Sequence, residues 1–169
     1  PDLGNPDDDY VGCDVSRGLG YAYNGDNFDE PKNGNAGYGA NPPAIGVDFF
    51  EGPYQDNDGI DNAYGVGPGM ALNGVGYGDG IIDNERFGMR RFLYYVNTGG
   101  GGNQNQTDPI KGLDYYNYMR GFWKDGTPFY YGGTGHISSS GADPSVPCDF
   151  MFPGDTDPLG WGTGGVPQP

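Results

Sequence analysis

The sequence predicts an α+β fold: one loop-rich, irregular domain over residues 1–169, with two aromatic-rich helices, a few short strands and acidic metal-binding loops. Gly and Pro supply 50 of 169 residues (35 + 15), which favours turns and short elements. Fourteen Tyr, nine Phe and two Trp carry too much apolar ring surface for a solvated tail. Two short segments repeat an acidic Asp-Gly step, which is typical of metal-binding turns.

Short strands are expected in the first third of the chain. Residues 1–47 are rich in Gly, Asn, Asp and Pro, with isolated aromatic residues between them. In GLGYAYNGD, Leu19, Tyr21 and Tyr23 alternate and an Asn-Gly step follows, which predicts a hairpin. The segment VDFF, residues 47–50, predicts another short strand.

A first helix is expected at about 84–96, NERFGMRRFLYYV. Asp83 or Asn84 can cap it, and Glu85 falls in its first turn, where an acid suits the helix dipole. Apolar and aromatic residues recur at helical spacing along it. The segment TGGGGNQNQ is expected to end it as a flexible linker.

A second helix is expected at about 109–123. Asp108 is a good N-cap and Pro109 a good first helical residue. One side of this helix carries Leu113, Tyr116, Met119 or Arg120, and Trp123. We expect the two helices to pack against each other through aromatic rings; the alternative is that the rings form a cofactor-binding box.

The segments DNDGIDN (56–62) and DGIIDNE (79–85) each resemble half of a calcium loop. Calcium takes six to eight oxygen ligands, and Gly adopts the tight turn between them. The two halves could share one ion, or each could complete its shell with backbone carbonyls, water, Asp48 or Glu51. The alternative is a pair of metal-free turns, because Asp and Gly both favour turns. The candidate calcium ligands are Asp56, Asp58, Asp61, Asn62, Asp79, Asp83 and Glu85.

Two weaker acidic clusters are the run of residues 7–9 and the pair Asp155 and Asp157. The net charge of −15 (8 − 23) excludes nucleic acid as an expected partner and gives bound divalent cations a neutralising role. No hydrophobic run approaches the roughly 20 residues of a membrane span, so no membrane insertion is expected. The chain opens on Pro, and we expect a fragment of a longer polypeptide.

The two cysteines, Cys13 and Cys148, lie near opposite ends of the chain. In a secreted domain such a pair is often bonded, so we predict a disulfide between them. The alternative is two buried thiols.

No catalytic motif is present, so we expect no enzyme and name no catalytic residue. His136 is the only histidine, and neither a HExxH segment nor a G-x-S-x-G elbow occurs. We expect His136 to be a hydrogen-bonded structural residue beside the serine run at 138–140. A glycosidase pair among the many carboxylates remains an alternative. Four aromatic residues could stack on sugars or fill the core: Trp123, Trp161, Tyr130 and Tyr131.

Five long motifs together resemble a region of large secreted or cell-surface proteins of Bacteroidota. They are GCDVSRGLGYAYNGD, NPPAIGVDFFEGPYQDNDGIDN, DGIIDNERFGMRRFLYY, DYYNYMRGFWKDGTPFYYGGTGH and CDFMFPGDTDPLGWGT. Such proteins are typically exported by the type IX secretion system and often carry a C-terminal sorting domain. The resemblance covers nearly the whole chain. It implies an extracellular location and a longer parent chain, and it implies no reaction.

The sequence therefore predicts a calcium-stabilised, structural or adhesion-type extracellular module. The expected partners are other domains of the same polypeptide, and surface glycans or other surface proteins. The alternatives are a glycan-binding or glycan-cleaving domain, and a subunit of an extracellular filament or surface assembly.

Overall fold

The computed structural model describes residues 4–5, 8–55, 57–63, 74–97, 102–154 and 160–161. The chain divides into two compact units, which are treated separately below. Unit 1 comprises Pro1–Arg90 with Phe152–Pro169, and unit 2 comprises Arg91–Met151.

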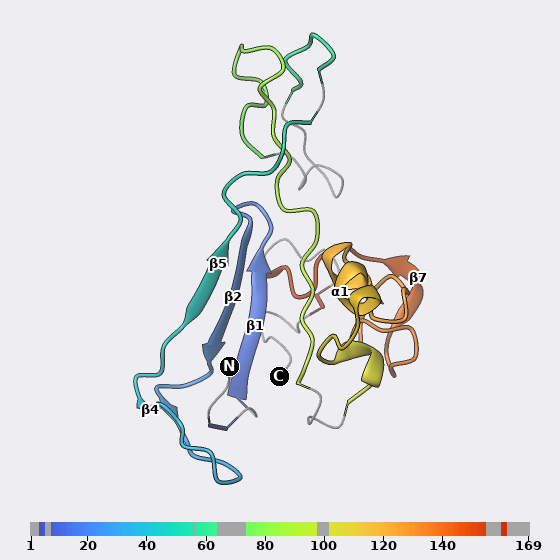
Figure 1. Cartoon of the computed structure of the whole chain (residues 1–169). Helices are drawn as coiled ribbons and strands as arrows, with labels where there is room; N and C mark the ends of the chain where they lie inside the picture. Colours follow the sequence, from blue (N-terminus) through green and yellow to red (C-terminus); the bar gives the residue numbers. More distant parts are fainter. Residues whose placement is uncertain are drawn as a thin grey trace. The chain divides into compact units, whose positions relative to one another are not determined.

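The predicted α+β fold with two aromatic-rich helices is wrong: the described residues form mostly strands and loops, with three short sheets. Within the described residues there is one α-helix, α1 (Gly112–Met119), besides a short 3-10 turn, η3 (Gln104–Gln106). The rest is short strands and loops (Figure 1). The strands are β1 (Asp9–Asp14), β2 (Leu19–Asn24), β3 (Phe28–Asp29), β4 (Gly39–Ala40), β5 (Ile45–Asp48), β6 (Tyr130–Tyr131) and β7 (Asp143–Pro147). No helix among the described residues has the length and apolar character needed to cross a membrane.

Unit 1 is built on a three-stranded antiparallel sheet in the order β1-β2-β5 (Figure 1). The predicted alternation of Leu19, Tyr21 and Tyr23 is confirmed as β2. The hairpin turn, however, precedes β2, at residues 15–18, instead of following it at Asn-Gly. Asp14 Oδ1 accepts the Arg17 N–H at 3.1 Å, and Gly18 completes the turn with a φ of +66°. The segment expected near residues 47–50 contributes its first part to β5.

The core of unit 1 lies beside β1. Cys13 is 1 % exposed, and its N–H donates to the Phe152 carbonyl at 3.1 Å. The ring of Phe152 packs on that of Trp161, with 5.1 Å between the centroids. Burial, with a smaller contribution from Asp14, raises the pKa of the Cys13 thiol to about 12. Cys148 is half-buried in unit 2, so the disulfide between the two residues stays a prediction.

The helix predicted at 84–96 is absent, and the segment is extended. In unit 1, the Phe87 N–H donates to the Pro53 carbonyl and the Gly52 N–H to the Phe87 carbonyl, both at 3.0 Å. In unit 2, Phe92 exchanges backbone bonds with residues 149 and 151 in the same way. These partners are distant in sequence, and Phe, Tyr and Val favour extended pairing. A short aromatic segment interrupted by Gly88 had too little local stability to compete as a helix.

The second predicted helix is real but shorter than expected. Its N-cap is Lys111, not Asp108, and the Asp114 carboxylate accepts the N–H groups of Ile110 (3.0 Å) and Lys111 (3.3 Å). Its end is a Schellman motif around Gly121, whose φ is +71°. Gly121 N–H donates to the Tyr118 carbonyl and Phe122 N–H to the Asn117 carbonyl, both at 2.9 Å.

Helix α1 buries polar side chains and exposes apolar ones. Asp114 and Asn117 are buried, and the Asn117 amide donates to the Lys124 carbonyl at 2.9 Å. Leu113 and Met119, by contrast, are 61 % and 80 % exposed. The expected packing of two helices through this stripe is therefore wrong.

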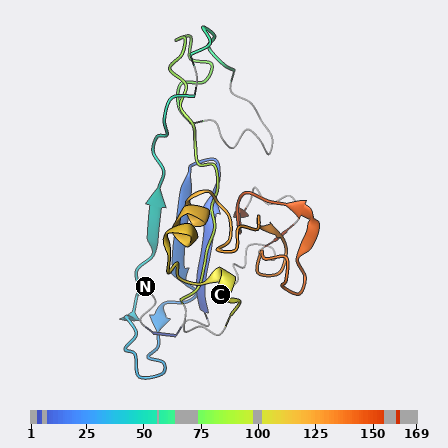
Figure 2. The same cartoon turned by 45° about the vertical axis from the view of Figure 1, so that its right-hand side comes forward.

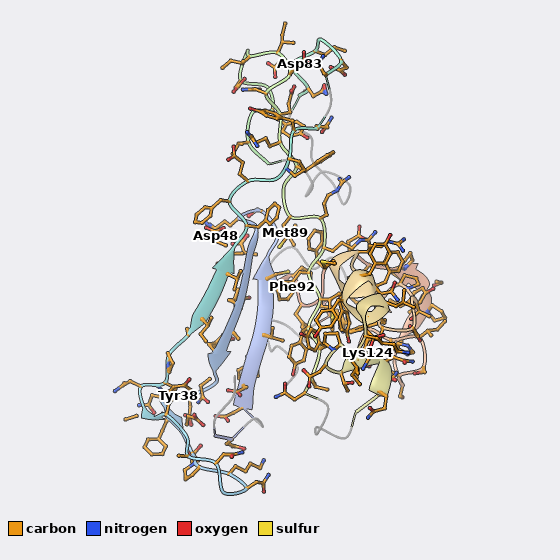
Figure 3. All side chains as sticks on the ribbon, in the orientation of Figure 1. Tyr38, Asp48, Asp83, Met89, Phe92 and Lys124 are labelled. Atoms are coloured by element: carbon orange, nitrogen blue, oxygen red, sulfur yellow. The ribbon has the colours of Figure 1, made fainter. Side chains whose placement is uncertain are left out.

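The core of unit 2 lies in the loops after α1. Trp123 and Phe129 are both fully buried and meet edge to face, with 5.9 Å between their centroids. The ammonium group of Lys124, labelled in Figure 3, donates to the hydroxyl of Thr107 at 2.8 Å and to the carbonyl of Asp108 at 3.0 Å. Asp108, predicted as a helix cap, thus contributes its backbone to a loop anchor.

Candidate functional site: the paired acidic loops

The two acidic segments form the same local turn. We call residues 57–62 acidic loop 1 and residues 79–85 acidic loop 2. In loop 1, Asp58 Oδ1 accepts the Ile60 N–H at 2.9 Å, and in loop 2, Asp79 Oδ1 accepts the Ile81 N–H at 2.8 Å. The intervening Gly59 and Gly80 have φ values of +79° and +89°, which an L side chain adopts at a cost. The internal repeat in the sequence is therefore a repeat in structure.

The two loops lie side by side and cap each other (Figures 1 and 2). Asp83 Oδ1 of loop 2 accepts the Gly59 N–H of loop 1 at 2.9 Å. In return, Asp61 of loop 1 accepts the N–H groups of Gly78 at 2.8 Å and Gly80 at 2.7 Å, one on each carboxylate oxygen. Figure 3 labels Asp83 within this pair. The two half-loops therefore lie close together, as the alternative of one shared ion requires.

Glu85 anchors the base of the pair. Its side chain is only 2 % exposed and its Oε1 accepts the Asn62 N–H. Its own carbonyl accepts the Gln55 N–H at 2.9 Å. Asn62, predicted as a ligand through its side chain, is here a backbone donor.

The acidic loops contain no basic side chain to balance their carboxylates. Arg86, which follows directly, forms an ion pair with Glu51 at 2.8 Å and places its guanidinium 3.9 Å from the centre of the Tyr54 ring. Bonds from the Asn84 amide and the Ile81 N–H hold the pKa of Asp79 below its usual value. The loop pair is therefore a concentrated negative charge at neutral pH.

Asn84 contains an oxygen that the sequence analysis did not identify. Its amide nitrogen donates to Asp79 Oδ2 at 2.9 Å, which directs the amide oxygen the other way. That oxygen, Oδ1, is buried and has no hydrogen-bond partner within the described structure. A buried acceptor without a donor is costly, and a cation would satisfy it. In the sequence, only the spacing of Asn84 from the Asp-Gly step could have indicated that its side chain is a candidate ligand.

The acidic loops suit calcium through the type of their ligand atoms, which are carboxylate and amide oxygens. Over the described ranges, no group of three or more His, Cys, Asp or Glu side chains is gathered as a ready metal cage. The carboxylates instead accept backbone N–H groups, and each carboxylate has about four lone-pair sites, more than these bonds use. Asp56, Asp155 and Asp157 lie outside the described residues.

Of the four aromatic residues that could stack on sugars or fill the core, the two Trp residues are buried. Trp123 and Trp161 are 0 % and 6 % exposed, so neither offers a ring face to a ligand. Tyr130 and Tyr131 are half-buried in β6.

Comparison of the chain with models of protein families, with curated proteins and with solved structures gives no match. The proposals below therefore rest on the residues themselves.

Proposed function

We propose that this chain is a calcium-stabilised structural or adhesion-type module of a larger extracellular protein. The observation that carries the proposal is the reciprocal capping of the two acidic loops. It holds together two acidic segments that lie about twenty residues apart in the sequence and contain no basic side chain, and it leaves the Asn84 Oδ1 oxygen buried without a donor. The residues that would hold calcium are Asp58, Asp61, Asp79, Asp83, Asn84 and Glu85, with Asp56 and Asn62 adjacent in sequence.

Calcium would act here by neutralisation. Like charges that a fold brings together repel, and a bound divalent cation turns that repulsion into attraction. Calcium also accepts a flexible, mixed shell of carboxylates, amide or backbone oxygens and water. This property suits loops whose carboxylates are already partly used by backbone N–H groups.

The extracellular placement is supported by the resemblance of the five motifs and by the acidic composition. The adhesion-type role is supported by exposed apolar side chains. In unit 1 they include Val47 and Phe50, which are 72 % and 83 % exposed, and in unit 2 Ile110 and Met119, at 75 % and 80 %. Side chains so exposed are available for contact with a partner. Their partners would be neighbouring domains of the same polypeptide, or other surface proteins or glycans.

Calorimetric titration of the full chain with calcium tests the proposal. We expect a dissociation constant of about 0.1–1 mM, the range of extracellular calcium modules. Asp58→Asn should weaken binding, whereas Asp143→Asn should not. The two positions share one local bond, because Asp143 Oδ1 accepts the Ser145 N–H at 2.9 Å as Asp58 Oδ1 accepts the Ile60 N–H, and Asp143 lies outside the acidic loops. Absence of binding, or equal losses in both variants, would remove the acidic loops from the account.

A further inference from the structure

Three residues of unit 2 form a continuous hydrogen-bonded chain. Ser138 Oγ lies 2.7 Å from His136 Nδ1, and Asp125 Oδ2 lies 3.0 Å from His136 Nε2. The histidine is buried, with 4 % of its surface exposed, whereas Ser138 is exposed. The order is hydroxyl, imidazole, carboxylate, which is the order needed to activate a serine.

A fixed donor determines the tautomer of His136. The Ser138 backbone N–H, which can only donate, points at Nδ1 at 3.1 Å. Nδ1 must therefore present its lone pair, and in the neutral ring the proton is on Nε2, where it is donated to Asp125. The basic nitrogen is thus the one that faces the Ser138 hydroxyl.

Asp125 is held as an ionised acceptor. Its Oδ1 accepts the Thr127 N–H at 3.0 Å and the Thr127 hydroxyl at 2.7 Å, and its Oδ2 accepts the Asn105 amide at 2.9 Å. Partial burial acts to raise the pKa of Asp125, but the bonds from Thr127 and His136 outweigh it and the pKa lies below its usual value. The carboxylate therefore stabilises an imidazolium when one forms.

A fourth group supplies a donor beside the hydroxyl. The Asn103 amide nitrogen lies 3.0 Å from Ser138 Oγ. The orientation of this amide is fixed, because its oxygen accepts the Asn105 N–H at 3.0 Å. A carbonyl carbon bonded to Ser138 Oγ would place its oxygen within reach of this donor, as an oxyanion requires.

The loop that carries His136 and Ser138 is pinned on both sides. The Ser139 N–H and Ser139 hydroxyl both donate to the His136 carbonyl at 2.8 Å. The Trp123 indole N–H donates to the Gly135 carbonyl at 3.0 Å from the buried core. The hydroxyl and imidazole are therefore preorganised and not brought together by chance side-chain rotation.

We propose that Ser138 is a nucleophile for acyl transfer from small activated esters, with His136 as general base and Asp125 as the residue that positions it. Ser138 Oγ attacks the ester carbonyl while its proton passes to His136 Nδ1. The ester C–O bond then breaks, and the leaving alkoxide takes that proton. Water attacks the acyl-serine with its proton passing to Nδ1, and the proton returns to Ser138 Oγ as the acid leaves. The balance is ester plus water to acid plus alcohol.

The test uses the full chain with p-nitrophenyl acetate and with a fluorophosphonate probe, whose fluoride leaves as the serine oxygen bonds phosphorus. We expect p-nitrophenolate release above the buffer rate, and peptide mapping should place the label on Ser138. Ser138→Ala should abolish the label and lower the rate to that of buffer. Ser140→Ala is the matched control, because Ser140 is exposed and two residues away, and it should change neither readout.

Asp125→Asn separates positioning from folding. The variant should lower kcat by about 100-fold or more and leave KM nearly unchanged, because of the reacting groups Asp125 contacts His136 alone. Its circular dichroism should match that of the native chain. The proposal is overturned if the probe labels no serine, if it labels Ser140 as readily as Ser138, or if Ser138→Ala hydrolyses the ester at the native rate.

Discussion

The reciprocal capping of the acidic loops makes a sharp prediction for two isosteric substitutions, Asp61→Asn and Asp58→Asn. Asp61 uses both carboxylate oxygens, one for the Gly78 N–H and one for the Gly80 N–H. Asparagine has a single oxygen, so Asp61→Asn must turn an NH₂ group towards one of these donors. Asp58 uses one oxygen for the Ile60 N–H, and Asp58→Asn can keep that bond.

The magnitude follows from the bond that is lost. A hydrogen bond to a charged group contributes about 1.5–3 kcal/mol, and solvent access in these loops brings the expected cost to about 1–2 kcal/mol. For a chain of 169 residues this corresponds to a fall in Tm of about 2–8 °C. Asp58→Asn should change Tm by less than about 2 °C by the same scale. Both variants remove one negative charge, so the change in net charge cancels in the comparison.

The assay is thermal unfolding followed by circular dichroism in EDTA, where neither variant can gain or lose a bound ion. The reasoning is refuted if the two variants have the same Tm, or if Asp58→Asn is the less stable of the two. Either result would mean that the bonds across the loop pair do not contribute to stability.

Two further predictions concern helix α1. Gly121→Ala should destabilise the chain by about 1–2 kcal/mol, because alanine resists a φ of +71°. Gly112→Ala is the control and should be neutral or stabilising, because a Cβ added there meets no other atom. Urea unfolding of both variants checks this prediction, and equal effects would contradict it. The pKa of Asp114 lies below its unfolded value of about 3.9, because the carboxylate accepts the N–H groups of Ile110 and Lys111 and lies near the charges of Lys111 and Lys124. The stability that Asp114 contributes is therefore full above that pH and is lost as pH falls through the lower folded pKa. Asp114→Ala should therefore lose less stability than the native chain as pH falls below about 4, and an unchanged slope in acid titrations of unfolding would count against the cap.

Local sequence patterns predicted local structure well where no distant backbone pairing competed with them. The alternation of Leu19, Tyr21 and Tyr23 is β2, and the region around α1 is helical. The start of the helix was misplaced because Lys111 is the N-cap and Asp108 is not. Only the folded chain shows that Asp114 reaches the N–H groups of Ile110 and Lys111.

Non-local pairing explains the main error. The sequence of residues 84–96 does not indicate that the Phe87 backbone bonds to Pro53, or that the Phe92 backbone bonds to residues 149 and 151. The same limit applies to the sites. The repeat of Asp-Gly steps indicated that the two loops are alike. It did not indicate that Asp61 and Asp83 each accept a backbone N–H group of the other segment. The sequence likewise placed His136 beside the serine run at 138–140, but it did not indicate that Asp125 lies against the other ring nitrogen.

The most direct test of the calcium proposal is thermal unfolding of the full chain in calcium, then in EDTA, and then with calcium restored. Because a ligand stabilises by RT ln(1 + [L]/Kd), calcium at 100 times its dissociation constant should add about 2.7 kcal/mol. We expect Tm to fall in EDTA by several degrees and to recover fully when calcium returns. An unchanged Tm across the three conditions would contradict the account and leave the acidic loops as metal-free turns held by their own hydrogen bonds.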